Sequence, residues 1–217
     1  MSLLTEESRR VHAARLGVVI FLASEGLLFA GLFALYAAYR VRFPAAFAAG
    51  VRLDLRWLGS LNTGILLASS ACMAGAVAVL ARGALTPPAG TGRQAAPRSR
   101  AAQALMLVTV ALGITFLILK GCEYADHIHT GIVPGGHSAW FAAHPDPGLK
   151  IFVALYFLMT ALHAVHMVVG IVWVSVLIPG ARTDTRSADR IELGALYWHF
   201  VDLLWVFLWP LFYLMRI

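Results

Sequence analysis

Charged residues and cysteines are both scarce in this chain of 217 residues. Only 13% of the residues are charged, whereas soluble domains usually carry about 25%. The two cysteines, Cys72 and Cys122, form no C-x-x-C pair, so neither a disulfide framework nor a thiolate metal site is indicated. We interpret them as free thiols packed as small hydrophobic groups. The sequence also lacks a nucleotide-binding loop and a nucleophile triad, so catalysis by the chain alone is not expected.

Hydrophobic residues make up 60% of the chain and are gathered in long runs. A helical membrane span needs about 20 apolar residues, and five stretches qualify, at approximately 16–39, 57–81, 101–119, 151–178 and 193–215. Helices are expected because backbone groups in lipid must be satisfied internally, and the runs do not alternate as barrel strands do. The sequence therefore predicts an all-α, polytopic membrane bundle of five helices. Residues 1–15 form a polar N-terminal segment, suited to a short interfacial helix, and residues 16–217 form the membrane domain.

The formal net charge of +6 is interpreted through the positive-inside rule rather than as nucleic-acid binding. With the N-terminus in the cytoplasm, ten of the 17 lysines and arginines lie on inside segments and seven on outside segments. This bias predicts a cytoplasmic N-terminus in a bacterial-type inner (plasma) membrane. A cleavable signal is not expected, because the first apolar run exceeds the length of about 7–15 residues of a signal core.

Two connecting segments are predicted to be loops. Residues 86–100 are rich in proline, glycine, alanine and arginine, which is typical of a mobile cytoplasmic loop. Residues 121–150 contain several prolines and glycines and are predicted to form an external loop. Its polar side chains are interpreted as a solvated docking surface, although the spacing of two of its histidines also suits a transition metal: Glu123, Asp126, His127, His129, His137 and His144.

Glu25 is the most informative single residue of the first span. It is the tenth residue of that run, so at 1.5 Å per residue it lies roughly 13.5 Å deep, near the middle of a bilayer. An ionised acid at that depth costs about 2.5–3.5 kcal/mol on insertion scales. Two interpretations stay open: a proton-linked or lipid-facing carboxyl, and a protonated acid that is hydrogen-bonded to a neighbouring helix.

The fourth and fifth spans each carry a pair of polar residues three positions apart. His163 and His166 share one helical face, and His199 and Asp202 have the same spacing. His166 and Asp202 lie at depths similar to Glu25, where polar groups can satisfy each other across helices. We therefore predict a hydrogen bond from Glu25 to His166 or His163. A metal site is not expected, because no Glu-x-x-His repeat occurs in the spans.

Tryptophans lie in the last two spans. Near span ends this residue commonly anchors a helix at the membrane interface. We interpret four tryptophans in this way, the last three on one helix face suited to a partner or to lipid: Trp173, Trp198, Trp205 and Trp209.

Five sequence blocks, in order along nearly the whole chain, resemble subunit III of the haem-copper oxidases. They are FLASEGLLF at 21–29, LNTGILLASS at 61–70, Glu123-Tyr124, LHAVHMVVG at 162–170 and YWHFVD at 197–202. Each block alone is a weak signal, but five in the family's order make chance similarity improbable. The resemblance marks further residues as family motif positions: Asn62, Glu123, Tyr124, Gly170, Tyr197 and Trp198.

The resemblance implies the five-helix form of a non-catalytic subunit. Longer relatives have two more N-terminal helices, which help to form a cleft that holds phospholipids. The family's subunit III carries no haem or copper, packs on subunit I, stabilises it and supports proton delivery, while the complex reduces oxygen to water and pumps protons. The implied partners are subunits I and II, a small subunit IV and phospholipids, with haem and copper in the partner subunits. Glu25 takes the place of the family's buried glutamate.

Other functions compete with this interpretation. Within the same family, the chain could be the similar protein associated with nitric oxide reductase. From other classes come a small proton-coupled transporter that uses Glu25 and the histidine pairs, and a membrane metalloenzyme. Within the oxidase interpretation, the sequence does not reveal whether the electron donor is cytochrome c or a quinol.

Overall fold

The computed structural model describes residues 2–53, 56–85, 95–135, 138–181 and 185–215. All regular structure within these ranges is helical. The elements are α1 (Ser2–Arg42), α2 (Pro44–Gly50), α3 (Arg56–Leu85), α4 (Ala95–Thr130), α5 (Ala139–Ala143), α6 (Pro147–Leu177), η1 (Ile178–Gly180), α7 (Thr185–Trp209) and η2 (Pro210–Leu214).

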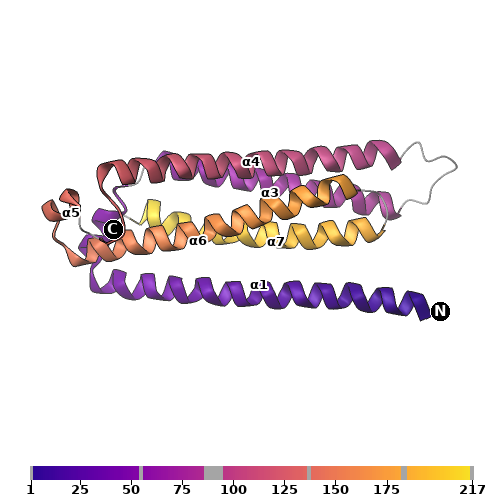
Figure 1. Cartoon of the computed structure of the whole chain (residues 1–217), viewed down its shortest axis with the longest axis horizontal. Helices are drawn as coiled ribbons and strands as arrows, with labels where there is room; N and C mark the ends of the chain where they lie inside the picture. Colours follow the sequence, from indigo (N-terminus) through magenta and orange to yellow (C-terminus); the bar gives the residue numbers. More distant parts are fainter. Residues whose placement is uncertain (1, 54–55, 86–94, 136–137, 182–184, 216–217) are drawn as a thin grey trace.

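Five of these helices are long and apolar enough to cross a membrane, which confirms the predicted fold class and makes the chain a multi-pass membrane protein. The spans lie within α1, α3, α4, α6 and the joined α7 and η2. They run along a common axis (Figure 1). The N-terminus lies at one end of the bundle, whereas α2, α5 and the C-terminus lie at the other end (Figure 1).

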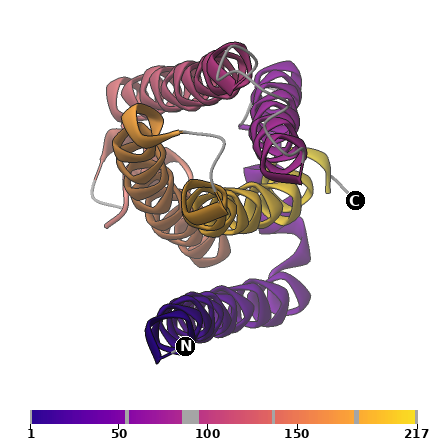
Figure 2. The same ribbon diagram turned by 90° about the vertical axis from the view of Figure 1, so that its right-hand side faces the viewer.

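Helices α3, α4, α6 and α7 form one group, and α1 lies beside it (Figure 2). Within the group, α4 packs along α3, and α7 contacts both α3 and α6. Among the spans, α1 packs mainly against α6 and α7. Most of its surface is therefore exposed, and side chains such as Leu16, Leu27 and Val41 point away from the bundle.

Helix α1 is joined to its neighbours by polar contacts at several levels along its length. Near the N-terminal end, Arg15 Nη2 lies 2.9 Å from a carboxylate oxygen of Glu192 and 3.1 Å from one of Asp189. At the opposite end, the Tyr36 hydroxyl donates to the carbonyl of Leu211 at 2.7 Å, and Arg40 donates to the carbonyl of Met215 at 3.2 Å. A contact through Glu25, described below, lies between these two levels.

Three predicted boundaries differ from the observed ones. Helix α1 runs without a break from Ser2, so residues 2–15 belong to the same helix as the first span rather than to a separate interfacial helix. Helix α4 begins at Ala95, so the loop predicted at 86–100 already ends there, and residues 86–94 lie outside the described part of the chain. Helix α4 also continues to Thr130, so the first ten residues of the predicted external loop are helical.

Helix α4 ends just before Gly131 and continues past its charged residues Lys120 and Glu123. Gly131 has φ +80°, a left-handed conformation that glycine adopts without steric cost. The N–H of Ile132 donates to the carbonyl of His127 at 2.8 Å, which satisfies a carbonyl of the last turn. Gly131 is therefore the stop signal of this helix, 12 residues after the predicted end of the third span at residue 119.

Helix α6 has a clear start signal. Asp146 precedes it, and the carboxylate accepts a hydrogen bond from the N–H of Gly148 at 2.8 Å. Pro147 occupies the first helical position, where its fixed φ fits and no N–H is needed. Together these residues begin the fourth span four residues earlier than predicted.

The core centres on Trp198, which was predicted to be an interface anchor but is 1% exposed. Its indole N–H donates to the Ser69 hydroxyl on α3 at 3.1 Å. A Cβ added at Gly113 on α4 would lie 2.8 Å from the indole, and one at Gly170 on α6 would lie 3.1 Å from it. Trp198 therefore joins four helices, and these two glycines make room for its ring.

Trp205 is also buried rather than an interface anchor. It is fully buried, and its indole N–H donates to the Thr63 hydroxyl on α3 at 3.1 Å. The ring packs edge-on against Phe116 of α4, with ring centres 4.7 Å apart. Trp173 and Trp209 are partly buried at the edge of the same core.

Candidate functional site

Glu25 and His166 meet between α1 and α6. The Glu25 Oε2 lies 3.0 Å from the His166 Nε2, and the two side chains are 20% and 10% exposed. The contact predicted from their matched depth is therefore confirmed for His166. The ring of Phe29, one turn along α1 from Glu25, packs edge-on against the imidazole with ring centres 5.6 Å apart.

The hydrogen bonds of His166 define how the pair shares a proton. The imidazole Nδ1 lies 2.8 Å from the carbonyl of Leu162. A carbonyl oxygen only accepts, so Nδ1 carries a proton and Nε2 faces the carboxyl group. Either neutral Glu25 donates to neutral His166, or protonated His166 donates to ionised Glu25. The pair has no net charge in either state, which reduces the cost of its burial.

Tyr197 supports this contact from α7. Its hydroxyl donates to the carbonyl of His166 at 3.0 Å, and its ring stacks with Phe21 of α1 at a centre-to-centre distance of 6.3 Å. Because Tyr197 touches both α6 and α1, it fixes the distance between the helices that carry Glu25 and His166. Among the motif residues, it is the one that joins the acid–imidazole pair to α7.

His163 does not join Glu25, although it shares a helical face with His166. It is fully buried, and its imidazole lies between the ring of Phe116 and the indole of Trp205, with ring centres 5.6 and 5.2 Å away. Neither ring nitrogen has a hydrogen-bond partner among the described residues. His163 is therefore a core residue of the α4–α6–α7 contact.

His199 and Asp202 belong to a different contact, between α7 and α3. The His199 Nδ1 lies 2.6 Å from the Ser70 hydroxyl. Asp202 is buried nearly one turn further along α7, near Ser70, but neither of its carboxyl oxygens has a hydrogen-bond partner among the described residues. The predicted common polar layer is thus divided: Glu25 pairs with His166 and His199 pairs with Ser70, whereas Asp202 and His163 join neither pair.

The most extensive polar network lies around Lys120, where the sequence had predicted the end of a span. Its ammonium group is 3.0 Å from Glu123 Oε1 and 2.9 Å from the hydroxyls of Tyr156 and Tyr213. The Tyr213 hydroxyl donates to the same Glu123 oxygen at 2.6 Å, and the Tyr156 hydroxyl also donates to it. All four residues are buried. The network joins α4, α6 and η2.

Sequence reasoning placed Glu123 and Tyr124 in a loop and so missed this network. Both lie on α4, and Glu123 follows Lys120 by three positions, so the two charges share a helical face. That spacing was the available signal. The hydroxyl of Tyr124 is hydrogen-bonded to that of Thr160 on α6. Of the other predicted loop residues, His127 is buried against the Tyr156 ring.

Two further family positions serve packing. Asn62 is fully buried on α3, and neither end of its amide has a hydrogen-bond partner among the described residues. Gly170 lies against the Trp198 ring, as described above. Among the described residues, which do not include His137, there is no group of three or more His, Cys, Asp or Glu side chains suited to a metal ion.

Comparison with known proteins gives similarity along nearly the whole chain. The sequence profile of the family described as cytochrome c oxidase subunit III matches residues 5–216. The chain is 30% identical to cytochrome c oxidase subunit 3 of Synechocystis sp. over 208 residues, which is 92% of this chain and 74% of that relative.

Relatives of both oxidase kinds align over comparable lengths. Cytochrome c oxidase subunit 3 of Thermostichus vulcanus is 26% identical over 207 residues, covering 92% of this chain and 86% of that protein. Quinol oxidase subunit 3 of Bacillus spizizenii is 26% identical over 203 residues, which is 92% of this chain and 86% of that protein. The similarity therefore extends across oxidases named for two different electron donors.

Proposed function

Because this chain belongs to the cytochrome c oxidase subunit III family, we propose that it packs against the catalytic subunit I of its complex, stabilises it and supports proton delivery. The chain is a subunit III of a terminal oxidase. In this proposal the complex reduces oxygen to water and pumps protons. Haem and copper reside in the partner subunits, and this chain contributes no catalytic residue.

The observation that carries the proton role is the Glu25–His166 pair. It holds one exchangeable proton between two groups, 3.0 Å apart and near the middle of two spans. Moving that proton from the carboxyl group to the imidazole leaves the net charge at zero, so the low-dielectric surroundings oppose the transfer less than they oppose a lone charge. Such a pair is suited to keeping a proton available inside the membrane during turnover.

The shape of the bundle supports a role for α1 at a lipid or partner surface. Among the spans it has the smallest buried share, 11% of its most apolar window. Its outward face is apolar, with Leu16, Ile20 and Leu27 each at least 60% exposed. In the proposal, this face is covered by phospholipid and by subunits of the complex, namely subunit I, subunit II and a small subunit IV.

The proposed topology follows from charge. The ends of α1 and α7 near the N-terminus carry several arginines, and the positive-inside rule places such segments in the cytoplasm. We propose a bacterial-type inner membrane with the N-terminus on the cytoplasmic side. The electron donor is left unassigned, because relatives of both kinds match this chain.

The complex itself is tested by purification through a tag on this chain in a mild detergent. The measurements are an absorption spectrum and mass spectrometry of the copurifying proteins. Haem absorption together with a large polytopic partner is the expected result. A colourless chain without partners, under conditions that keep membrane complexes intact, contradicts the proposal and favours a proton-coupled transporter.

The proton role is tested in the purified complex with Glu25→Gln. The amide retains a hydrogen bond to His166 but cannot exchange a proton, so it separates proton supply from packing. We expect normal assembly and initial oxygen consumption, followed by faster loss of activity during sustained turnover. Ser24→Ala, a change at an exposed neighbour, is the matched control. Identical turnover by both variants and the unaltered complex rules out the proton role.

A further inference from the structure

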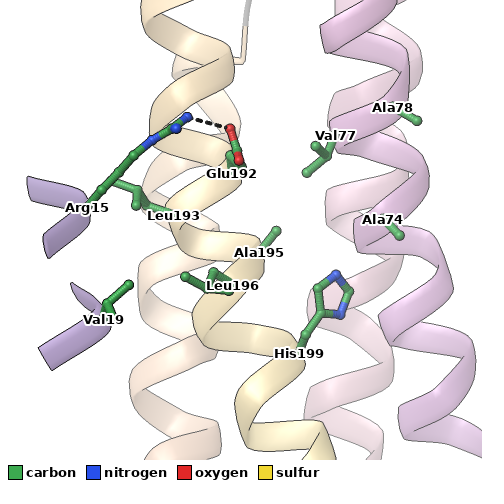
Figure 3. Close-up of a pocket in the computed structure, with 10 residues that line it drawn as sticks. All are labelled: Arg15, Val19, Ala74, Val77, Ala78, Glu192, Leu193, Ala195, Leu196 and His199. Carbon is green, nitrogen blue, oxygen red and sulfur yellow. Dashed lines mark hydrogen bonds and ion pairs between the residues drawn. The ribbon is translucent and has the colours of Figure 1, made fainter. Parts of the chain in front are cut away.

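A groove outside the Glu25–His166 pair opens between α1, α3 and α7, toward the N-terminal end of the bundle. It has a volume of about 410 Å³, within the range of small-molecule sites. Figure 3 shows its lining, which is largely apolar and includes several alanines. The lining residues are Arg15, Val19, Ala74, Val77, Ala78, Glu192, Leu193, Ala195, Leu196 and His199. Such small side chains leave room for a flat, apolar group.

Apart from Arg15 and Glu192 at its mouth, the groove has one polar residue in its lining, His199. Its ring points from α7 into the space between α7 and α3, and Ala74 and Val77 of α3 line the same groove (Figure 3). The Nδ1 is bonded to the Ser70 hydroxyl at 2.6 Å, and the structure describes no partner for Nε2. A ligand with one oxygen on an apolar body would satisfy Nε2, because a polar atom that faces lipid without a partner costs free energy.

The charged groups at the mouth of the groove are already paired. Arg15 Nη2 lies 2.9 Å from a carboxylate oxygen of Glu192 (Figure 3). The same nitrogen lies 3.1 Å from a carboxylate oxygen of Asp189. A phosphate group would have to compete with two carboxylates for this guanidinium. The mouth therefore favours an uncharged ligand over an anionic phospholipid.

The depth of His199 also discriminates between ligands. Glu192 and His199 are seven residues apart on α7, which corresponds to about 10 Å along the helix. A phospholipid with its phosphate at the mouth would place saturated methylene groups at the depth of His199. Nε2 would then lack a partner, whereas an oxygen-bearing ring inserted below the headgroup layer would reach it.

From these observations we propose that the groove binds a neutral isoprenoid quinone or quinol, with one ring oxygen hydrogen-bonded to Nε2 of His199. The alanines of α3 face the ring, and the isoprenoid chain extends toward the lipid. The site binds the ligand and performs no electron transfer, so the inference is independent of the electron donor and of the role of Glu25. Its consequence is a quinone held beside a terminal oxidase, outside any catalytic site of the partner subunits.

The test is photolabelling in native membranes with an azido-substituted benzoquinone that carries a short isoprenoid chain. The labelled residues are mapped by mass spectrometry of this chain. We expect label on α3 and α7 around Ala74 and His199, displaced by excess unlabelled quinone. His199→Leu removes one hydrogen bond and should weaken labelling about fivefold.

Ala74→Phe fills the groove and should reduce labelling at least about tenfold. Ala111→Phe, the same change at an exposed position on α4 outside the groove, should leave labelling unchanged. Both variants are first checked for normal amounts of the chain in the membrane. Equal labelling in the two variants overturns the proposal, as does label confined to other parts of the chain. Loss of a copurifying phospholipid in Ala74→Phe, with labelling unaffected, identifies the groove as a phospholipid site instead.

Discussion

The carboxyl group of Glu25 contacts the imidazole of His166, 141 positions later in the chain, at 3.0 Å. This contact joins the helix that lies beside the bundle to one that lies within it. Since α1 buries little apolar surface, polar contacts account for an unusually large share of what holds it in place. The Glu25–His166 contact is the most deeply placed of them.

The strength of this contact is measurable by a double-mutant cycle. Glu25→Ala leaves His166 Nε2 without its partner and should destabilise the chain by about 0.6–1.7 kcal/mol, from the average to the largest value measured for interhelical hydrogen bonds in a membrane protein. Glu25→Gln should cost less, because the amide still reaches the imidazole. Thermal unfolding of Glu25→Ala, His166→Leu and the double variant gives the coupling energy. Additive effects of the two changes mean that the contact contributes nothing to stability.

Breaking the buried pair at Lys120 should be far more costly. Lys120→Met leaves the carboxylate of Glu123 buried without its cation, which typically costs about 3–5 kcal/mol. Lys120→Met combined with Glu123→Leu removes both charges and should recover most of that loss. The single and double variants are compared by their yield and by their thermal stability in detergent. A double variant that is less stable than the single one would show that the pair is worth more than its desolvation cost.

The Trp198 ring should leave too little space for a methyl group at position 113. An added methyl group there would lie 2.8 Å from the indole, so Gly113→Ala should destabilise the bundle by about 1–3 kcal/mol through overpacking. Gly64→Ala is the control, because no atom lies within 4 Å of the added Cβ. Thermal unfolding should separate the two variants clearly. Equal stability of both would mean that the indole moves aside freely.

Backbone conformation should decide the effect of replacing Gly131. With φ +80° at this position, Gly131→Ala puts an L-residue in the left-handed region at a cost of about 1–2 kcal/mol. Gly121→Ala lies ten residues earlier in the interior of α4 and meets no atom within 4 Å. It should stabilise the helix by about 0.5–1 kcal/mol. Both variants are compared with the unaltered chain by thermal unfolding and by the rate of proteolysis in the segment after α4.

The number of spans and the Glu25–His166 contact were predictable because each depends on one strong physical cost. Lipid requires long apolar helices, and it makes an unpaired acid expensive near the midplane. Since Glu25 and His166 lie at matched depths, pairing them was the simplest way to meet that cost. The proton role assigned to the pair stays a prediction that the turnover experiment addresses.

The inward faces of the helices were harder to predict. Spans that are apolar all round have no periodic pattern that marks the core side. Position along the span is then the remaining guide, and it wrongly predicts interface anchors at Trp198 and Trp205. The end of α4 was misjudged for a related reason. Charged residues such as Lys120 and Glu123 predict the aqueous side, whereas in the structure these two neutralise each other inside the helix bundle.

The last turn of the fifth span has a consequence for how the protein is made. Residues 210–214 supply Tyr213 to the Lys120 network and a backbone acceptor to Tyr36, so they contact both α4 and α1. These contacts cannot form until the preceding four spans have entered the membrane and residue 214 has left the ribosome. During synthesis the first four spans are therefore in the membrane before Tyr213 is available, and until then Lys120 and Glu123 lack the hydrogen bonds that its hydroxyl makes with them.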